Sequence, residues 1–434
     1  MPPRFEHVNP AVDEPRERAQ PHTRALGRRS FITKGLAVVG LGTALPAAFV
    51  RAVVAEGVPP GVTAKRRVLL VLQLGGGNDG LNTVIPYRDG AYFTARPRIA
   101  VSAEAALHLN DQLALHPSMA GIKALWDKQQ VAIVQGVGYP NPNRSHFRAM
   151  EIWHTASLAE DERTGWLGRL LDATHHEQAA AWRAANVGSA LPPSLIAQRS
   201  FVPSLSGVPT YTLASDPAAR GQSARRVTDW VRLYAEQAAL GGALALVSRA
   251  GTQAYESTLD LQRETASYQP MAEYPNNALA TALKTCAQIV TANLGTTIAY
   301  VTTGGFDTHA GQANTQTALL QGVSDAVAAF YADLAAREMD GDVLTVMWTE
   351  FGRRVRENGS GGTDHGTATP LFLFGGGVQA GVYGETPSLA SLDQGDLKFN
   401  TDFRSVYATL LARWLRVDPR DVLQGSFPEL PLLR

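Results

Sequence analysis

Side chains that can bind metal ions or act as nucleophiles gather in five short segments of the sequence. The segments are rich in glycine and mix carboxylate, imidazole, hydroxyl and guanidinium groups: residues 75–80 (GGGNDG), 141–146 (NPNRSH), 304–309 (GGFDTH), 349–353 (TEFGR) and 361–367 (GGTDHGT). Carboxylates and imidazoles together suit zinc, manganese and similar ions, and two such ions can hold a phosphoryl or sulfuryl group. The segments therefore indicate a metal site with oxygen and nitrogen ligands.

Each acid and histidine in these segments also has a purely structural interpretation. An aspartate that follows a strand often caps the next helix, and His365 can simply hydrogen-bond a carbonyl group. Asp307 and His309 alternate along the chain, so both face one ion only if the chain bends, which the neighbouring glycines allow. The recurrence of such residues after successive strands favours a shared site over separate structural roles.

Ser145 is the best placed nucleophile in the sequence. It stands at the start of a predicted helix, where backbone N–H groups and the helix dipole favour an anion. A helix N-cap requires the same placement, so both roles remain open for Ser145. His146 and Asn143 are alternative groups for direct contact with a substrate. Arg144 or Arg353 would offset charge on the leaving group.

Continuous apolar runs adjoin these segments and predict the strands that position them. Runs without polar alternation are typical of strands buried on both faces of a parallel sheet, and they occupy residues 67–74, 131–137, 297–302, 343–349 and 370–374. Helical patterns alternate with them at residues 114–128, 147–155, 277–293, 315–337 and 401–415. This alternation predicts an α/β fold with a mostly parallel sheet. Ligands bind beyond the carboxyl ends of such strands, so the segments should meet at one edge.

The stretch from about residue 160 to residue 269 has a different character. It is rich in alanine and arginine, its pattern is mostly helical, and only residues 211–213 (YTL) resemble a buried strand. We interpret it as a helical insertion beside the sheet. Residues 67–434 as a whole are predicted to form a single domain.

The N-terminal region predicts export. Arg28 and Arg29 precede Phe31 and Lys34, an uncharged apolar stretch covers residues 35–50, and the small residues 53–55 offer a cleavage site. This order is typical of a twin-arginine signal peptide, and the apolar stretch is shorter than the roughly 20 residues that span a bilayer. We therefore expect a signal region at 1–56, a linker at 57–66, the twin-arginine translocation machinery as a partner, a periplasmic or secreted protein, and no stable membrane span.

Composition limits the remaining classes of function. Lys plus Arg and Asp plus Glu both number 39, which leaves no basic surplus for binding nucleic acid. Cys286 is the only cysteine, which excludes an intramolecular disulfide framework and cysteine-based zinc or iron–sulfur sites. A hydrophobic content of 45% is enough for a large buried core.

The motifs together resemble those of the bacterial domain of unknown function 1501 family, whose members are typically exported by the twin-arginine route. The resemblance spans residues 67 to about 415, nearly the whole chain after the signal region, and rests on GGNDGLN, RSHFR with IWHTA, GGFDTH, and TEFGRRV with NGSGGTDHGTA. That family is in turn similar to the alkaline phosphatase/sulfatase superfamily. This similarity implies a three-layer α/β/α domain and hydrolysis of phosphate or sulfate esters at one or two metal ions.

The resemblance also implies roles for individual residues. Ser145 matches the nucleophile of the superfamily, Asp79 the acid that binds one metal after the first strand, and Asp307 and His309 the ligands of the other metal, with His365 as the last histidine ligand. Glu350 stands where a typical member has an Asp-His pair, and Phe351 replaces that histidine. Asp364 would supply the missing charge.

The replacement by Phe351 leaves two functions open. The first is a metal-dependent hydrolase of small-molecule phosphate or sulfate esters with one or two divalent ions (Zn, Mn, Mg or Ca) as cofactor. The second is a non-catalytic exported binding or scaffold protein that keeps the fold, because fold alone does not determine function.

Overall fold

The computed structural model describes residues 67–174, 181–211, 223–238, 242–292 and 294–434. The predicted signal region (1–56) and linker (57–66) lie outside the described residues. Among the described residues, no helix combines the length and the apolar character needed to cross a membrane.

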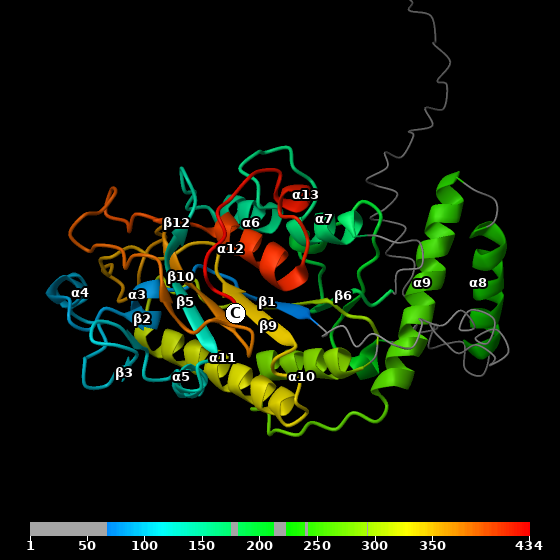
Figure 1. The fold of residues 1–434 in the computed structure, drawn as a ribbon, viewed down its shortest axis with the longest axis horizontal. Coiled ribbons are helices and arrows are strands. Elements are labelled where there is room, and N and C mark those ends of the chain that lie inside the picture. Colours follow the sequence, from blue (N-terminus) through cyan, green and yellow to red (C-terminus); the bar gives the residue numbers. More distant parts are fainter. Residues whose placement is uncertain (1–66, 175–180, 212–222, 239–241, 293) are drawn as a thin grey trace, which may run out of the picture.

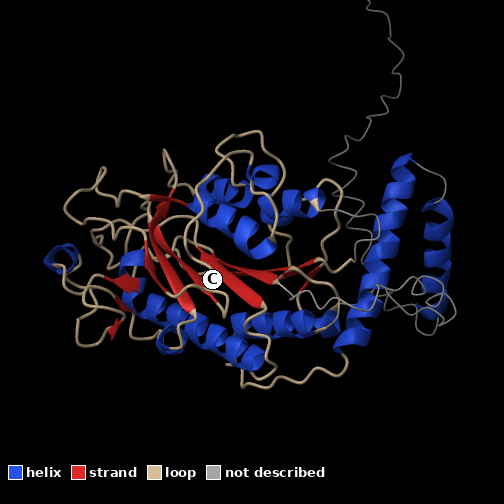
Figure 2. Ribbon diagram, viewed as in Figure 1, coloured by secondary structure: helices blue, strands red, loops and turns tan. Residues whose placement is uncertain are grey.

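A nine-stranded sheet forms the centre of the molecule (Figure 2). Its spatial order is β11 (Gly381–Tyr383), β5 (Val131–Gly138), β10 (Thr369–Phe374), β9 (Val343–Trp348), β1 (Val68–Leu74), β8 (Ile298–Thr303), β6 (Ala184–Val187) and β7 (Ser204–Leu205), and β12 (Thr401–Asp402) pairs with β5. Strand β10 runs antiparallel to both of its neighbours, and every other pairing is parallel. The carboxyl ends of β1, β5, β8 and β9 therefore share one edge.

Helices cover both faces of the sheet (Figure 1). One layer consists of α5 (Ala120–Asp127), α10 (Ala278–Thr291) and α11 (Gln312–Ala335), and the other of α6 (His146–Thr155), α7 (Trp166–Ala173), α12 (Phe403–Thr409), η3 (Leu410–Leu415) and α13 (Arg420–Leu423). All seven residues of β1 are buried, because Leu70 and Leu72 face the first layer while Leu69 and Val71 face the second. The predicted three-layer α/β/α architecture is confirmed.

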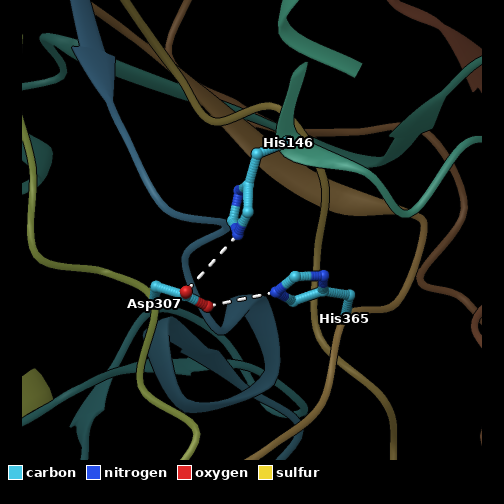
Figure 3. Close-up of side chains that lie close together, drawn as sticks. All are labelled: His146, Asp307 and His365. Atoms are coloured by element: carbon cyan, nitrogen blue, oxygen red, sulfur yellow. Dashed lines mark hydrogen bonds and ion pairs between the residues drawn. The ribbon is translucent and has the colours of Figure 1, made fainter. Parts of the chain in front are cut away.

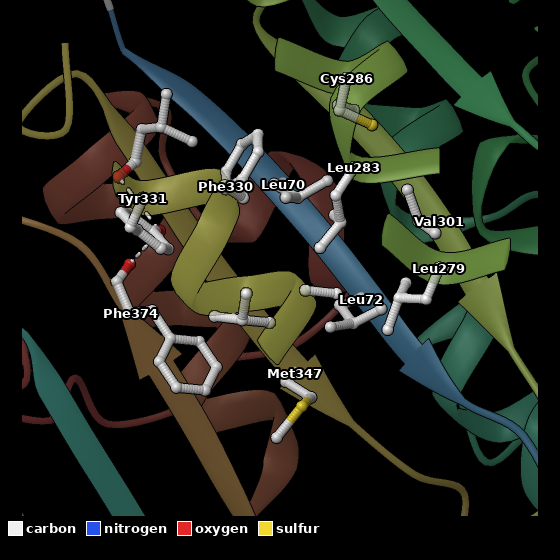
Figure 4. Close-up of a cluster of buried hydrophobic side chains, with 14 of the residues drawn as sticks. Leu70, Leu72, Leu279, Leu283, Cys286, Val301, Phe330, Tyr331, Met347 and Phe374 are labelled. Atoms are coloured by element: carbon white, nitrogen blue, oxygen red, sulfur yellow. Dashed lines mark hydrogen bonds between the residues drawn. The ribbon is translucent and has the colours of Figure 1, made fainter. Parts of the chain in front are cut away.

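The core between β1 and the α10–α11 layer is closely packed (Figure 4). Leu283, Cys286 and Phe330 lie against the strands, and the thiol of Cys286 is fully buried. The hydroxyl of Tyr331 donates to the carbonyl of Phe374 at 2.7 Å. This bond ties α11 to the antiparallel strand β10.

The segment after β1 differs from its sequence prediction. A short helix α3 (Gly80–Thr83) leads into a second, three-stranded sheet of β2 (Val84–Ile85), β4 (Ala114–Leu115) and β3 (Leu107–His108), with α4 (Gly90–Ala95) between β2 and β3. The helix predicted from residue 114 begins only at Ala120, because Pro117 disfavours helical backbone at the residue before it.

The insertion at 160–269 contributes to the sheet, which the sequence pattern did not indicate. Strands β6 and β7 come from this stretch, and β6 pairs with β8. The stretch also contains the short helices η1 (Pro193–Leu195) and η2 (Val208–Thr210) and two long helices, α8 (Ser223–Ala238) and α9 (Gly242–Thr265), which stand at one end of the molecule (Figure 1). Of the predicted strand 211–213, only Tyr211 is described, and it follows η2 rather than lying in a strand.

Candidate metal centre

Loops at the carboxyl edge of the sheet bring most of the predicted site residues into contact. His146 begins α6 after β5, Asp307 and His309 follow β8, and Glu350 follows β9. His365 lies in the loop before β10 and forms an isolated antiparallel bridge with Arg353. The parallel sheet therefore gathers these residues from widely separated positions, as the sequence predicted.

Asp307 is at the centre of this group (Figure 3). Its Oδ1 lies 3.1 Å from His365 Nε2 and 3.0 Å from His309 Nε2, and its Oδ2 lies 3.5 Å from His146 Nε2. One ligand atom from each of His146, Asp307 and His365 lies within 4.8 Å of the others. We refer to His146, Asp307, His309 and His365 as the His–Asp cluster.

Each histidine of the cluster is held through its Nδ1 atom. His365 Nδ1 lies 2.8 Å from the carbonyl oxygen of Arg144, and this oxygen can only accept, so the ring donates from Nδ1. The corresponding partners are Glu350 Oε1 at 2.8 Å for His146 and Asp364 Oδ1 at 3.3 Å for His309. In a neutral ring donating from Nδ1, the lone pair lies on Nε2. All three Nε2 atoms therefore face the cluster as acceptors.

These acceptors lack donors of their own. The Nε2 atoms of His309 and His365 are 2.9 Å apart, so two lone pairs face each other when both rings are neutral. His146 Nε2 is buried and has no hydrogen-bond partner in the structure. Buried nitrogens are normally satisfied, and a divalent cation bound by imidazole and carboxylate groups satisfies all of these atoms at once. The residues present therefore fit a metal ion.

Electrostatics keeps Asp307 ionised. Burial raises the pKa of this carboxyl, but the hydrogen bond from Arg353, the contact with His365 and the charge of Arg353 outweigh burial and lower the pKa to about 2. The Arg353 Nη2 atom donates to Asp307 Oδ1 at 2.7 Å. Asp307 therefore carries a negative charge at any physiological pH.

Arg353 has a structural role rather than the predicted contact with a leaving group. Its side chain is fully buried. It donates to the carbonyl oxygens of Gly76, Gly77, Phe306 and Thr363 as well as to Asp307. The guanidinium group thus joins three loops of the site, and its complete burial keeps it out of reach of a substrate in solution.

Glu350, predicted as a metal ligand, contacts His146 Nδ1. Its side chain is fully buried, and its Oε1 accepts from the backbone N–H of Gly76 at 2.9 Å as well as from His146. Oε2 accepts from the Thr349 hydroxyl. Phe351 packs against the cluster, with its ring centroid 4.8 Å from that of His146 and 4.7 Å from that of His365.

Asp364, also predicted as a metal ligand, contacts His309 Nδ1. Its Oδ1 accepts from Asn358 Nδ2 at 3.0 Å and from His309 Nδ1. The hydrogen bond from Asn358 is the main cause of a lowered pKa for Asp364. The carboxylate therefore orients His309, as carboxylates commonly do for metal-binding histidines.

Asp79, predicted as a metal ligand, contacts groups outside the His–Asp cluster. It is the N-cap of α3, where Oδ1 accepts from the backbone N–H of Leu81. Its Oδ2 pairs with the buried Arg96 at 2.5 Å and also accepts from Gln312. These donors satisfy the carboxylate, so Asp79 anchors the loop after β1.

Ser145 occupies the N-cap position of α6 but does not cap it. Its side chain makes no capping hydrogen bond, and the residue is exposed. Its backbone N–H donates to Asn143 Oδ1 at 2.8 Å. The cap interpretation of Ser145 is therefore wrong, and its hydroxyl is not used by the helix.

Arg144 and His146, both predicted as catalytic residues, also contact the cluster. The Arg144 guanidinium pairs through Nε and Nη2 with Asp396, which is fully buried, while its carbonyl oxygen holds His365. His146 belongs to the cluster through Nε2. Arg144 thus supports the cluster through its carbonyl oxygen. One guanidinium nitrogen, Nη1, does not contact Asp396.

Several supporting residues were absent from the sequence prediction. Arg96, Gln312, Asn358 and Asp396 lie outside the five segments, and only their contacts reveal them. Gln312 alone had a usable signal, because it follows His309 by three positions at the start of a helix.

Comparisons with known proteins give weak structural similarities and one family. The similar solved structures include the sulfatase PsFucS1 from Pseudoalteromonas sp. (TM-score 0.38, 13% identity, 84% of this chain and 71% of that chain). They also include the zinc complex of the C-terminal periplasmic domain of EptC from Escherichia coli (TM-score 0.34, 10% identity, 71% and 73%). A third is a protein in the alkaline phosphatase superfamily from Vibrio parahaemolyticus (TM-score 0.33, 10% identity, 82% and 72%).

A search of curated proteins found no significant match. A family model described as a protein of unknown function (DUF1501) matches residues 65–426. The family predicted from the motifs is therefore confirmed, and this chain belongs to it.

Proposed function

We propose that this protein is a metal-dependent hydrolase of phosphate or sulfate esters. The observation that carries the proposal is the convergence of three imidazole Nε2 atoms on Asp307, next to a serine whose hydroxyl is not used by its helix. Each of these imidazoles is fixed in one orientation by an oxygen atom on Nδ1, which supports metal binding.

The ion would be held by His146, Asp307 and His365, with His309 as a fourth ligand. When bound, it would polarise an ester oxygen and favour ionisation of a nearby hydroxyl group. We propose one ion per chain, because Asp79 and Glu350, which the superfamily resemblance offered as further ligands, are occupied by Arg96 and His146. Three nitrogens and one carboxylate match the ligand preference of zinc.

The residues of the chain would divide the remaining work. Ser145 would attack the phosphorus or sulfur atom, because it is exposed directly before His146 at the N-terminus of α6. Its hydroxyl proton would pass to water, the P–O or S–O bond to the alcohol would break, and a second water would then hydrolyse the seryl ester to release phosphate or sulfate. That helix terminus also favours negative charge on the transferred group. The Nη1 atom of Arg144, which Asp396 does not use, would contact the same anion.

The export predicted from Arg28 and Arg29 remains part of this proposal. The twin-arginine route carries folded proteins, and the cluster depends on loops that come together only in the folded chain. The ion would therefore bind in the cytoplasm, after the chain folds and before it is exported. The protein would then act on small-molecule esters in the periplasm or outside the cell.

One observation favours the alternative of a non-catalytic binding or scaffold protein. Phe351 stands where the superfamily resemblance implies a histidine, and its ring is 3% exposed and packed beneath the cluster. A protein of this kind would keep the His–Asp cluster for binding and would leave Ser145 without a chemical role.

Turnover on a panel of aryl phosphates and aryl sulfates separates these functions. For a hydrolase, Ser145→Ala should lower the rate by several orders of magnitude while metal binding and melting temperature stay near the wild-type values. Ser388→Ala is the matched control, because Ser388 is an exposed serine that caps the backbone N–H groups of Ala390 and Ser391. A Ser145→Ala protein that retains its full rate would contradict the nucleophile assignment.

A further inference from the structure

Phe147 is far more exposed than any other large hydrophobic side chain among the described residues. It is 87% exposed, whereas the next most exposed, Met271, is 57% exposed. The remaining ones are leucines and an isoleucine between 37% and 52%, so Phe147 is also the one aromatic ring in this set. Covering an exposed aromatic ring removes apolar surface from water, so a ligand that covers Phe147 gains binding free energy.

The support beneath Phe147 is rigid, so its exposure does not reflect a loose helix end. Ala149 and Trp153 of α6 are at most 1% exposed, and Trp153 stacks on Trp348 of β9 with a centroid distance of 5.0 Å. The loop that enters the helix is fixed by the Tyr139 hydroxyl, which accepts from the backbone N–H of Asn143 at 3.1 Å. The ring is therefore presented from a fixed position.

That position borders the proposed reaction centre. Phe147 directly follows Ser145 and His146 in the first turn of α6. Successive helical side chains diverge by about 100°, so Phe147 leaves α6 on a different side from His146, with the two Cα atoms only about 3.8 Å apart. The side chains of Asp307 and His309 are 47% and 43% exposed, so the cluster opens to solvent. If the anionic group of a ligand lies at the cluster, the rest of the ligand lies over the protein surface around it.

We propose that Phe147 contacts the non-reacting part of the substrate, and that this part has a flat apolar face, as an aromatic or sugar ring has. This inference rests on the proposed function for the placement of the anionic group at the cluster. Stacked and edge-to-face ring contacts add to the effect of burial, so the ring should contribute to affinity and to the choice between substrates. Phe147 would thus determine specificity without taking part in the reaction.

The test measures affinity for stable anions rather than turnover. Zinc-loaded full-length protein is titrated by calorimetry with methylphosphonate, phenylphosphonate and a glucose phosphonate that has a P–C bond. The last two compounds represent the two ring types. We expect at least one ring compound to bind about tenfold more tightly than methylphosphonate. Phe147→Ala should abolish this preference, and Phe147→Tyr, which keeps the ring, should retain it.

Met271→Ala is the matched control, since Met271 contacts Asp333 near the far end of α11, roughly 30 Å along that helix from Gln312. A Phe147→Ala protein with the wild-type preference would overturn the inference, as would absence of phosphonate binding by the zinc-loaded wild type. The inference would also be overturned if the wild type is a dimer and Phe147→Ala is a monomer, because the ring would then contact a second copy of the chain. If the wild type prefers ring compounds but hydrolyses no ester, the proposed hydrolase function is contradicted, and the role of Phe147 in binding is not.

Discussion

Replacing Glu350 with Gln should weaken metal binding without unfolding the protein. The amide oxygen can still accept from Gly76 N–H and His146 Nδ1, and the amide nitrogen can donate to the Thr349 hydroxyl, so the shape and the bonds survive. What is lost is the negative charge behind His146. A hydrogen bond to a charged group contributes about 1.5–3 kcal/mol and a neutral one about 0.5–1.5 kcal/mol, so the loss is about 1–1.5 kcal/mol. That loss corresponds to roughly tenfold weaker affinity, at the low end of the range of about 10–100-fold for such supporting residues.

The assay is competition for Zn²⁺ against a chelator of known affinity, with the melting temperature of the metal-free protein measured in parallel. Glu357→Gln is the matched control, because Glu357 also accepts backbone N–H groups, from Arg98 and Ile99, but does not touch the cluster. We expect weaker zinc binding for Glu350→Gln only. Equal zinc affinity in the wild type and Glu350→Gln would refute the support that Glu350 gives to His146.

Three further predictions concern charge and export. Asp307→Asn should remove most metal affinity. In the metal-free protein, the pKa of Asp307 is lowered from 3.8 to about 2, so this carboxylate should stabilise the fold above about pH 4 and lose that effect as the pH falls to 2. Urea denaturation of the wild type and Asp307→Asn across that pH range would show the difference. Burial lowers the pKa of His154 to about 3, so this histidine is neutral in both the folded and the unfolded state above about pH 6.5 and costs no stability there. Between those values stability should fall by up to about 1.4 kcal/mol per pH unit on acidification, and His154→Gln should reduce that slope in denaturation experiments; an unchanged slope would contradict a buried neutral His154. Replacing Arg28 and Arg29 with Lys should leave full-length precursor in the cytoplasm, and mature protein in the periplasmic fraction would indicate another route.

The central sheet could be predicted from the sequence because its main strands are buried on both faces. Strands β1, β5, β8, β9 and β10 each coincide with a continuous apolar run. Strand β6 was missed because its four residues, Ala-Ala-Asn-Val, give too short a signal within an alanine-rich stretch. Its assignment to the sheet depends on pairing with β8, which local pattern does not encode.

The location of the site was also predictable, but the roles of its residues were not. The rule for parallel sheets placed His146, Asp307 and His365 at one edge, since it depends only on strand order and direction. Which carboxylates face the centre depends on single hydrogen bonds. Glu350 and Asp364 point at Nδ1 atoms, and Asp79 is taken by Arg96. Residue type and spacing do not distinguish these arrangements.

The central claim is that the His–Asp cluster binds one divalent ion. Its most direct test is the metal content of protein purified with its export signal intact and then reloaded with Zn²⁺, measured by elemental analysis. The prediction is one equivalent per chain, lost in His365→Ala and kept in His108→Ala, which removes an exposed histidine that stacks on Tyr87 outside the cluster. No bound metal after reloading, or metal retained in His365→Ala, would contradict the claim.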